Sequence, residues 1–150
     1  MRWRRNLRHL RACSWTERWL LLEAGGWLGL MGLAVWLLPF RRVAALLGLA
    51  PGETGAAVEP ATDVAAARVG WALRAMAART PWPSTCLVQA LAGLVMLRRR
   101  HIAGTLYLGV AKDSPRPEAL VAHAWLRCGP TILTGAAEYQ NFTVIAAFSG

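Results

Sequence analysis

The sequence has few cysteines and none of the spacings that pair them. The three cysteines, Cys13, Cys86 and Cys128, form an odd set with no close pair. A small disulfide-stabilised domain carries an even set at short spacings, and such frameworks form in oxidising compartments. The pattern therefore argues against a disulfide scaffold and predicts a reducing, cytoplasmic location. Each thiol has to be judged by its own position.

Acidic residues are also scarce. Seventeen lysines and arginines stand against eight aspartates and glutamates, which gives a net charge of +9. Six of the arginines lie in residues 2–18, where Glu17 is the one acid. A basic segment of this kind suits an anionic membrane surface or an acidic partner. Tryptophans among arginines can bind single-stranded nucleic acid, but here they run into a long apolar segment. That arrangement favours lipid or protein, so no nucleic-acid partner is expected.

Residues 19–40 form a long apolar run, WLLLEAGGWLGLMGLAVWLLPF, in which Glu23 is the one charge. Its length reaches the roughly 20 residues needed to span a bilayer. The glutamate, the glycines and the basic residues on both flanks weaken a spanning assignment. A helix that lies in the membrane interface, or packs on a partner, is the alternative. The run is too long for a signal-peptide core and lacks a clean cleavage site.

The chain divides by composition into three parts. Residues 1–50 are basic and then apolar, which predicts a helical N-terminal region associated with a membrane. Residues 51–62, PGETGAAVEPAT, have the composition of a solvated linker. Residues 63–150 form the expected domain, because a chain of 150 residues holds one core of ordinary size rather than two. No internal repeat is present.

The domain is expected to begin with two helices. Residues 63–79 have the spacing of an amphipathic helix, and residues 86–99 predict another, capped by Ser84 or Thr85. The predicted buried face of the first helix is Val64, Ala67, Trp71, Ala75 and Ala78. The predicted stripe of the second is Leu87, Leu91, Leu94 and Val95.

Strand character replaces helical periodicity after His101. The candidate strands are residues 102–110, 120–128, 131–134 and 142–148. Turn signals at DSPRP and CGP separate three of them. The predicted fold class is therefore α+β, with helices followed by a small antiparallel sheet.

Cys86 follows a turn signal and opens a predicted helix. The segment PWPSTCLVQA places it directly after two prolines and a Ser-Thr pair. The first turn of a helix presents free N–H groups and the positive end of the helix dipole, and both favour a thiolate over a thiol. The thiolate is the nucleophilic form, so Cys86 is a candidate nucleophile. Alternatively, cysteine is among the most buried residue types and could simply fill a gap beneath the sheet.

His123 is the candidate partner among three histidines. His9 lies in the basic segment, and His101 follows three arginines, as expected of a solvated helix C-terminus. A thiolate nucleophile needs an imidazole to hold the ion pair and to protonate the leaving amine. On the strand LVAHAWLRC, His123 shares a face with Trp125 and Arg127, and the arginine indicates a cleft rather than a dry core. A hydrogen-bonded structural histidine is the alternative.

Two segments, PWPSTCLVQALAGLVMLRRRHI and AHAWLRCG, together resemble the B2 proteins of lasso-peptide biosynthesis. These proteins are leader peptidases with a transglutaminase-like, papain-related cysteine protease core. The shared features are a cysteine after a proline-rich turn, a helix ending in RRR, the glycine-containing strand LYLGV and the H-A-W triplet. The resemblance covers about residues 63–148, and the LLPFRRVAALLG end of the apolar third is also typical.

The resemblance implies a reaction and a set of partners. Cys86 would attack the amide between the leader and core of a ribosomally made precursor peptide. His123 would act as base and then acid, and a carboxylate would orient it. A separate lasso cyclase would then close the freed core N-terminus into a macrolactam. The chain leaves no room for the leader-binding domain that some members carry, so a separate leader-binding partner protein is expected. No cofactor and no resident metal are expected.

The third catalytic residue departs from the family pattern. The expected aspartate falls near Gly135, and no aspartate follows Asp113. Glu138 is the nearest acidic substitute, or else an ordinary turn carboxylate in GAAEYQN. A backbone carbonyl or the amide of Asn141 could also orient the imidazole, since the third member mainly fixes its tautomer and geometry.

Three other interpretations use the same residues. A metal site would take Cys86, His123 and Cys128, but structural zinc needs four ligands, usually in close pairs. A non-catalytic membrane-associated adaptor or scaffold would use the tryptophans and arginines of the N-terminal third. An acyl transferase would keep the fold and the Cys86 thioester but resolve it with an amine instead of water.

Overall fold

The computed structural model describes residues 13–112, 120–137 and 139–150, and within them the fold class is α+β, as predicted. The helices are α2 (Trp15–Leu37), α3 (Phe40–Leu46), α4 (Pro60–Ala77) and α5 (Cys86–Arg98), with a 3-10 turn, η1 (Tyr139–Asn141). The strands are β1 (Ala50–Pro51), β2 (Thr105–Lys112), β3 (Leu120–Cys128), β4 (Thr131–Thr134) and β5 (Thr143–Ser149). They form one antiparallel sheet in the order β1-β5-β2-β3-β4. The four predicted strands are confirmed.

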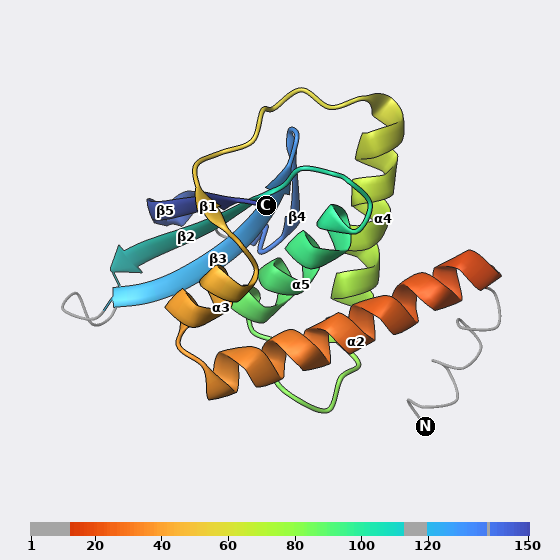
Figure 1. The fold of residues 1–150 in the computed structure, drawn as a ribbon, viewed down its shortest axis with the longest axis horizontal. Coiled ribbons are helices and arrows are strands. Elements are labelled where there is room, and N and C mark those ends of the chain that lie inside the picture. Colours follow the sequence, from red (N-terminus) through yellow and green to blue (C-terminus); the bar gives the residue numbers. More distant parts are fainter. Residues whose placement is uncertain (1–12, 113–119, 138) are drawn as a thin grey trace.

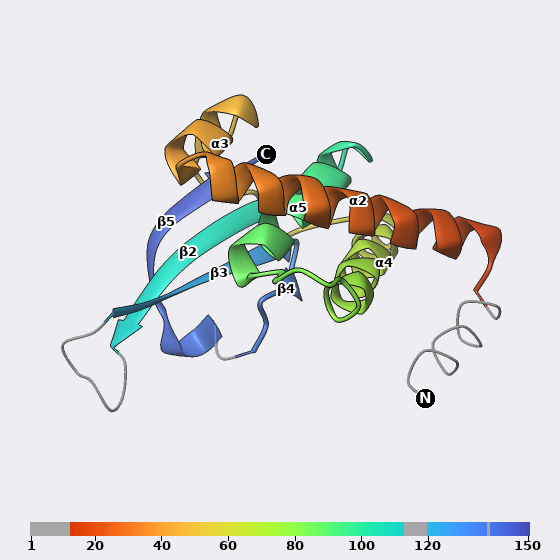
Figure 2. The same ribbon diagram turned by 90° about the horizontal axis from the view of Figure 1, so that it is seen from below.

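The helices cover one face of the sheet in two layers. Helix α5 packs against β2, β3 and β4, and α4 packs beside it and against β4. Helix α2 crosses α4 and α5 on their far side from the sheet (Figures 1 and 2). The described chain therefore has one hydrophobic core, to which α2, α4, α5 and the sheet all contribute.

Helix α5 is the central element and is covered on nearly every side. Its first turn is capped as predicted, because the Thr85 hydroxyl accepts a hydrogen bond from the Val88 N–H at 3.3 Å. The buried residues are Val88, Ala90, Leu91, Ala92, Gly93, Leu94, Met96 and Leu97. The predicted single stripe was too narrow, since two helices and the sheet enclose α5. Gly93 allows β3 to approach closely: a Cβ there would lie 2.5 Å from the Leu126 side chain.

Helix α4 turns a different face inward from the one predicted. Val64 and Trp71, both assigned to the buried face, are 61% and 39% exposed. The buried residues are instead Ala66, Val69, Gly70, Ala72 and Leu73. The helix also begins at Pro60 rather than Asp63, because proline suits the first helical turn, where its missing N–H costs nothing. Small side chains face the core because the packing is close: a Cβ on Gly70 would lie 3.1 Å from the Leu133 carbonyl oxygen.

Helix α2 is buried along one side only. A capping box of Ser14 and Glu17 begins it, and the chain breaks before Pro39, so the predicted apolar run becomes two helices. The inner side consists of Leu20, Leu21, Ala24, Leu28 and Met31. Within the described part of the chain, α2 is the one helix that by length and composition could cross a membrane.

An ion pair fixes α2 to the C-terminal end of α5. Glu23 accepts hydrogen bonds from Arg99 at 3.1 Å and from Arg100 at 2.6 Å. The Arg100 guanidinium is the main reason that the pKa of Glu23 lies below its usual value. The three arginines were expected to form a solvated helix C-terminus; Arg99 and Arg100 in addition join the end of α5 to α2 through Glu23.

Candidate functional site

Cys86 is the first residue of α5 and is half-buried. The preceding turn is held by side chains: the Gln89 amide donates to the Ser84 carbonyl at 2.8 Å, and the Thr80 and Ser84 hydroxyls lie 3.0 Å apart. The first-turn N–H groups of a helix lack partners within it, so the helix start presents hydrogen-bond donors beside the thiol. This local structure is what the sequence predicted for a reactive cysteine.

His123 lies on β3, opposite Gly109 of β2, and its imidazole is fixed by a backbone group. Its Nε2 lies 2.8 Å from the Gly135 carbonyl oxygen. A carbonyl can only accept, so Nε2 carries the hydrogen and Nδ1 is the nitrogen that can take up a proton. The ring packs on Phe142 at 4.9 Å and on Trp125 at 5.9 Å between centroids. The imidazole is thus held in one tautomer and one orientation.

Gly135 occupies the position near which an aspartate was expected. Its φ of +72° lies in the left-handed region, and a Cβ there would lie 2.5 Å from the Ala124 carbonyl oxygen. The local backbone therefore has no room for an aspartate side chain, and the peptide carbonyl itself contacts the imidazole. Asn141, in η1, is exposed and makes no side-chain hydrogen bond among the described residues. Glu138 lies outside the described residues.

Strand β3 separates the imidazole from the core. Leu126 faces α5, whereas His123 shares the opposite face with Trp125, as strand alternation predicts. The N-terminal end of α5 nevertheless lies next to β3 in both views (Figures 1 and 2). Within the described chain, no hydrogen bond joins the Cys86 thiol to the His123 imidazole. The structure therefore places the two residues on packed elements without a direct bond.

An arginine closes the far end of the histidine face. Arg127 donates to the Tyr107 hydroxyl at 3.0 Å and to the Thr54 carbonyl at 2.9 Å. Thr54 in turn bonds the buried Thr105 hydroxyl at 2.8 Å. Residues of the predicted linker thus cover the Arg127 end of this face, which was not foreseen. Aromatic residues occupy the His123 end: Tyr107, Trp125, Tyr139 and Phe142.

Cys128 does not belong to this site. It is fully buried in the core, and burial, followed by the nearby Asp63 carboxylate, raises the pKa of its thiol. Because it is an odd number of residues from His123 on one strand, its side chain points to the other face. The described residues contain no group of three His, Cys, Asp or Glu side chains that could hold a metal. The metal-site interpretation is therefore not supported.

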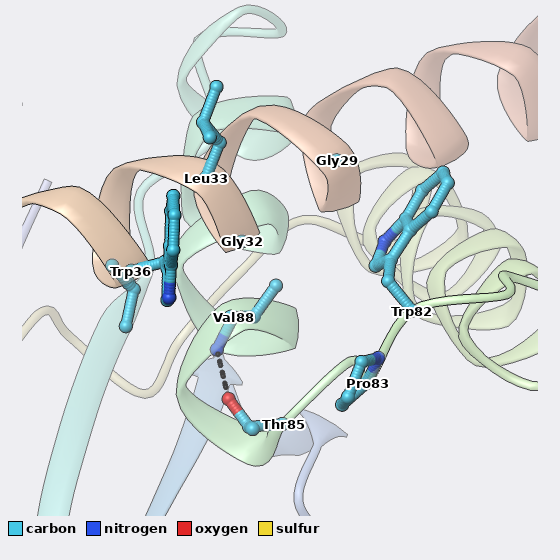
Figure 3. Close-up of a pocket in the computed structure, with 9 residues that line it drawn as sticks. Gly29, Gly32, Leu33, Trp36, Trp82, Pro83, Thr85 and Val88 are labelled. Atoms are coloured by element: carbon cyan, nitrogen blue, oxygen red, sulfur yellow. Dashed lines mark hydrogen bonds between the residues drawn. The ribbon is translucent and has the colours of Figure 1, made fainter.

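An apolar groove of about 510 Å³ lies beside the start of α5. Gly29 and Gly32 of α2 form its floor, and Trp36 and Trp82 stand at its two ends (Figure 3). The remaining lining residues are Leu33, Val35, Pro83, Thr85 and Val88. Thr85, which directly precedes Cys86 in the sequence, lines the groove, whereas Cys86 itself does not. Sequence analysis missed it because its two sides come from α2 and from the turn before α5.

Comparison with known protein families gives one match. The profile described as the transglutaminase-like superfamily matches residues 30–147. No curated protein and no solved structure matches the chain. The matched residues span more than half of the sequence and include Cys86, His123 and Gly135. The chain therefore belongs to the transglutaminase-like superfamily, a group related to cysteine proteases.

Proposed function

We propose that this chain is a cysteine peptidase that removes the leader from a ribosomally made lasso precursor peptide. The observation that carries the proposal is the pairing of two features in one transglutaminase-like chain. Cys86 begins a capped helix, and His123 is held in a single tautomer by the Gly135 carbonyl. The resemblance of the PWPSTC and AHAW segments to the lasso leader peptidases supplies the substrate class.

The proposed reaction runs through a thioester. The Cys86 thiolate attacks the carbonyl carbon of the leader–core amide, and N–H groups at the start of α5 stabilise the oxyanion. The C–N bond then breaks, and the His123 imidazolium gives its Nδ1 proton to the leaving amine of the core. Next, Nδ1 takes a proton from water, the resulting hydroxide attacks the thioester, and the leader leaves as a carboxylic acid. The Cys86 thiolate leaves from carbon, so the thiolate and the His123 imidazolium are both restored.

The orienting group in this proposal is a neutral carbonyl rather than a carboxylate. By accepting the Nε2–H hydrogen bond, a carbonyl fixes the tautomer and the orientation of the ring. It carries no full charge, so it stabilises the imidazolium less. Catalytic hydrogen bonds are often long in ligand-free enzymes and tighten only with substrate. Because His123 lies on the face of β3 opposite α5, the pairing of Cys86 with His123 is proposed from the resemblance, and it requires the imidazole to reach the start of α5 when substrate binds.

The groove beside Thr85 fits an apolar substrate side chain near the scissile bond. A Cβ at Gly32 would lie in van der Waals contact with the Val88 side chain at 4.0 Å, so a leucine there would occupy the groove between α2 and α5. We expect Gly32→Leu to raise KM for precursor while kcat changes little. Gly26→Leu is the matched control, because a Cβ at Gly26 meets nothing within 4 Å.

The same proposal assigns partners. A separate leader-binding protein would deliver the precursor, and a lasso cyclase would consume the freed core peptide. The reaction would take place in the cytoplasm, where the cyclase finds its nucleotide.

An acyl transferase would instead join the leader carboxyl to an added amine, and mass spectrometry distinguishes that product from the product of hydrolysis.

The test is precursor cleavage followed by mass spectrometry, with the leader-binding protein present. We expect one defined cut with the native chain and a loss of at least about a thousandfold in Cys86→Ala and His123→Ala. Cys13→Ala is the control that removes a different thiol. Circular dichroism checks that each variant is folded. Undiminished cleavage by either site variant would refute the mechanism, and no cleavage by the native chain would favour the adaptor interpretation.

A further inference from the structure

The outer side of α2 is a continuous apolar surface, here called the α2 stripe. It consists of Trp15, Trp19, Leu22, Leu30, Leu33, Trp36 and Leu37, each at least 50% exposed. Most of these residues follow one another by three or four positions, which places them on one side of the helix, and the exposed Gly26 lies in the gap between Leu22 and Leu30. A soluble monomer rarely leaves an apolar patch of this length uncovered. The stripe is therefore expected to have an occupant.

Charge lies at the edges of the α2 stripe, where the Arg18 guanidinium is 5.5 Å from the centroid of the Trp15 ring. Glu17 lies in the capping box, and Glu23 pairs with Arg100, so neither acid lies on the stripe. At the C-terminal end of α2, Arg41 and Arg42 of α3 are exposed. Five arginines among residues 2–11 precede the helix in the sequence. Basic residues thus precede the helix in the sequence and follow it in α3, and tryptophans mark the two ends of the stripe.

We propose that the α2 stripe binds the surface of an anionic membrane, with α2 lying flat in the interface. Tryptophan prefers the headgroup level, and arginines at the ends attract anionic lipids. A spanning orientation conflicts with the fold. It would remove Leu21, Ala24 and Leu28 from the core and break the Glu23–Arg100 pair. The buried side therefore holds α2 to the domain while the exposed side meets the lipid.

The occupant is lipid rather than a second copy of the chain, on grounds of charge. Each copy carries a net charge of +9, and the exposed Arg41 and Arg42 follow the C-terminal end of the stripe. Two copies meeting through this surface would bring like charges together. An anionic bilayer instead supplies the opposite charge along the full length of the helix.

Vesicle flotation of the full chain tests the proposal. The probes are vesicles of phosphatidylcholine alone and of phosphatidylcholine with about one third phosphatidylglycerol. We expect the native chain to float with the anionic vesicles. Leu22→Gln combined with Leu30→Gln should weaken binding by roughly tenfold or more. Val64→Gln is the matched control, because this equally exposed aliphatic residue lies on α4. Arg41→Gln with Arg42→Gln should lower affinity for the anionic vesicles alone, by about fivefold per arginine.

Hydrogen exchange separates a flat orientation of α2 from a spanning one, and light scattering separates lipid binding from dimerisation. Hydrogen exchange on vesicles should leave the α5 amides as protected as in solution, whereas deprotection of α4 and α5 would show that α2 leaves the core to span. Thermal unfolding checks that the variants are folded. The proposal is overturned if the native chain does not float, or if Leu22→Gln with Leu30→Gln floats like the Val64→Gln control. It is equally overturned if that double variant instead abolishes a dimer seen by light scattering.

Discussion

The two faces of β3 belong to different parts of the molecule, although both are formed by one strand of nine residues. One face carries Ala124, Leu126 and Cys128, all buried beneath α5. The other carries His123, Trp125 and Arg127, which form ring contacts and hydrogen bonds instead of a dry core. Alternation along a strand alone generates this difference. A single strand can therefore be both the base of the core and the wall of a chemical site.

The difference shows which properties of the chain are tightly constrained. On the core face, close packing leaves little freedom, since Gly93 is needed to let Leu126 approach α5. On the histidine face, orientation depends on a few directed contacts, of which the Gly135 carbonyl is the most specific. Changes on the first face should therefore act through stability, and changes on the second through geometry.

The largest contrast is expected between the reactivities of two thiols, Cys86 and Cys128. Cys128 is fully buried on the core face, whereas Cys86 is half-buried at the start of α5. Native protein treated with iodoacetamide should be alkylated at Cys86 at least about a hundredfold faster than at Cys128. Peptide mapping by mass spectrometry measures both sites in one sample. Equal rates in the native state would contradict this picture, and denatured protein provides the reference in which both thiols react.

Truncation of one residue on each face should separate stability from exposure. Leu126→Ala should lower the free energy of unfolding by about 3 kcal/mol, because it leaves a cavity against Gly93 and Leu73. Val121→Ala, on the histidine face and 42% exposed, should change it by less than about 0.5 kcal/mol. Urea unfolding followed by circular dichroism measures both. Similar values for the two variants would mean that α5 does not pack on the Leu126 face.

A methyl group at Gly135 should disturb the histidine face specifically. The φ of +72° and the 2.5 Å approach to the Ala124 carbonyl both oppose a side chain, so Gly135→Ala should cost about 2 kcal/mol. The displaced carbonyl should also release the His123 Nε2–H, which nitrogen NMR detects as a change in tautomer population. Gly26→Ala is the control, and it should stabilise slightly because it is an open helical position. An unchanged imidazole spectrum in Gly135→Ala would remove the carbonyl from its orienting role.

Much of the fold follows from short-range signals in the sequence. Strand alternation and turn residues located β3 and β4 to the residue, and a Ser-Thr pair after two prolines located the start of α5. The face of α4 was predicted wrongly: Val64 and Trp71 were assigned to the core, whereas Val69 and Leu73 are buried there together with smaller residues. Close packing instead requires small residues, as at Gly70. Such a requirement depends on the distance between packed elements, and a local sequence pattern gives no information on that distance.

In the candidate site, the sequence predicted the setting of those residues that lie in a helix or a strand, but not the contacts made by residues in turns and connections. Strand alternation gave the shared face of His123 and Trp125, and helix capping gave the setting of Cys86. The Gly135 contact could not be chosen among the alternatives, because a carbonyl direction depends on a left-handed turn that the sequence alone does not specify. The contact between Arg127 and Thr54 joins residues far apart in the chain, one of them in the predicted linker. No local pattern indicates such a pair.

The smallest expected effect concerns the pH dependence of stability on the core face. Burial raises the pKa of the Cys128 thiol, so the folded chain keeps this proton to higher pH than the unfolded chain does. The unfolded thiol ionises near its ordinary pKa of about 8.5. The resulting stability is fully present below that value and is lost as the pH rises through the pKa of the folded thiol. As the pH rises above that value, the native chain should therefore lose more stability than Cys128→Ala does. Urea titrations at several pH values measure this difference in slope, independently of any constant cost of the substitution. Parallel curves would show that the thiol is better solvated than its position under α5 implies, and would weaken the contrast between the two faces of β3.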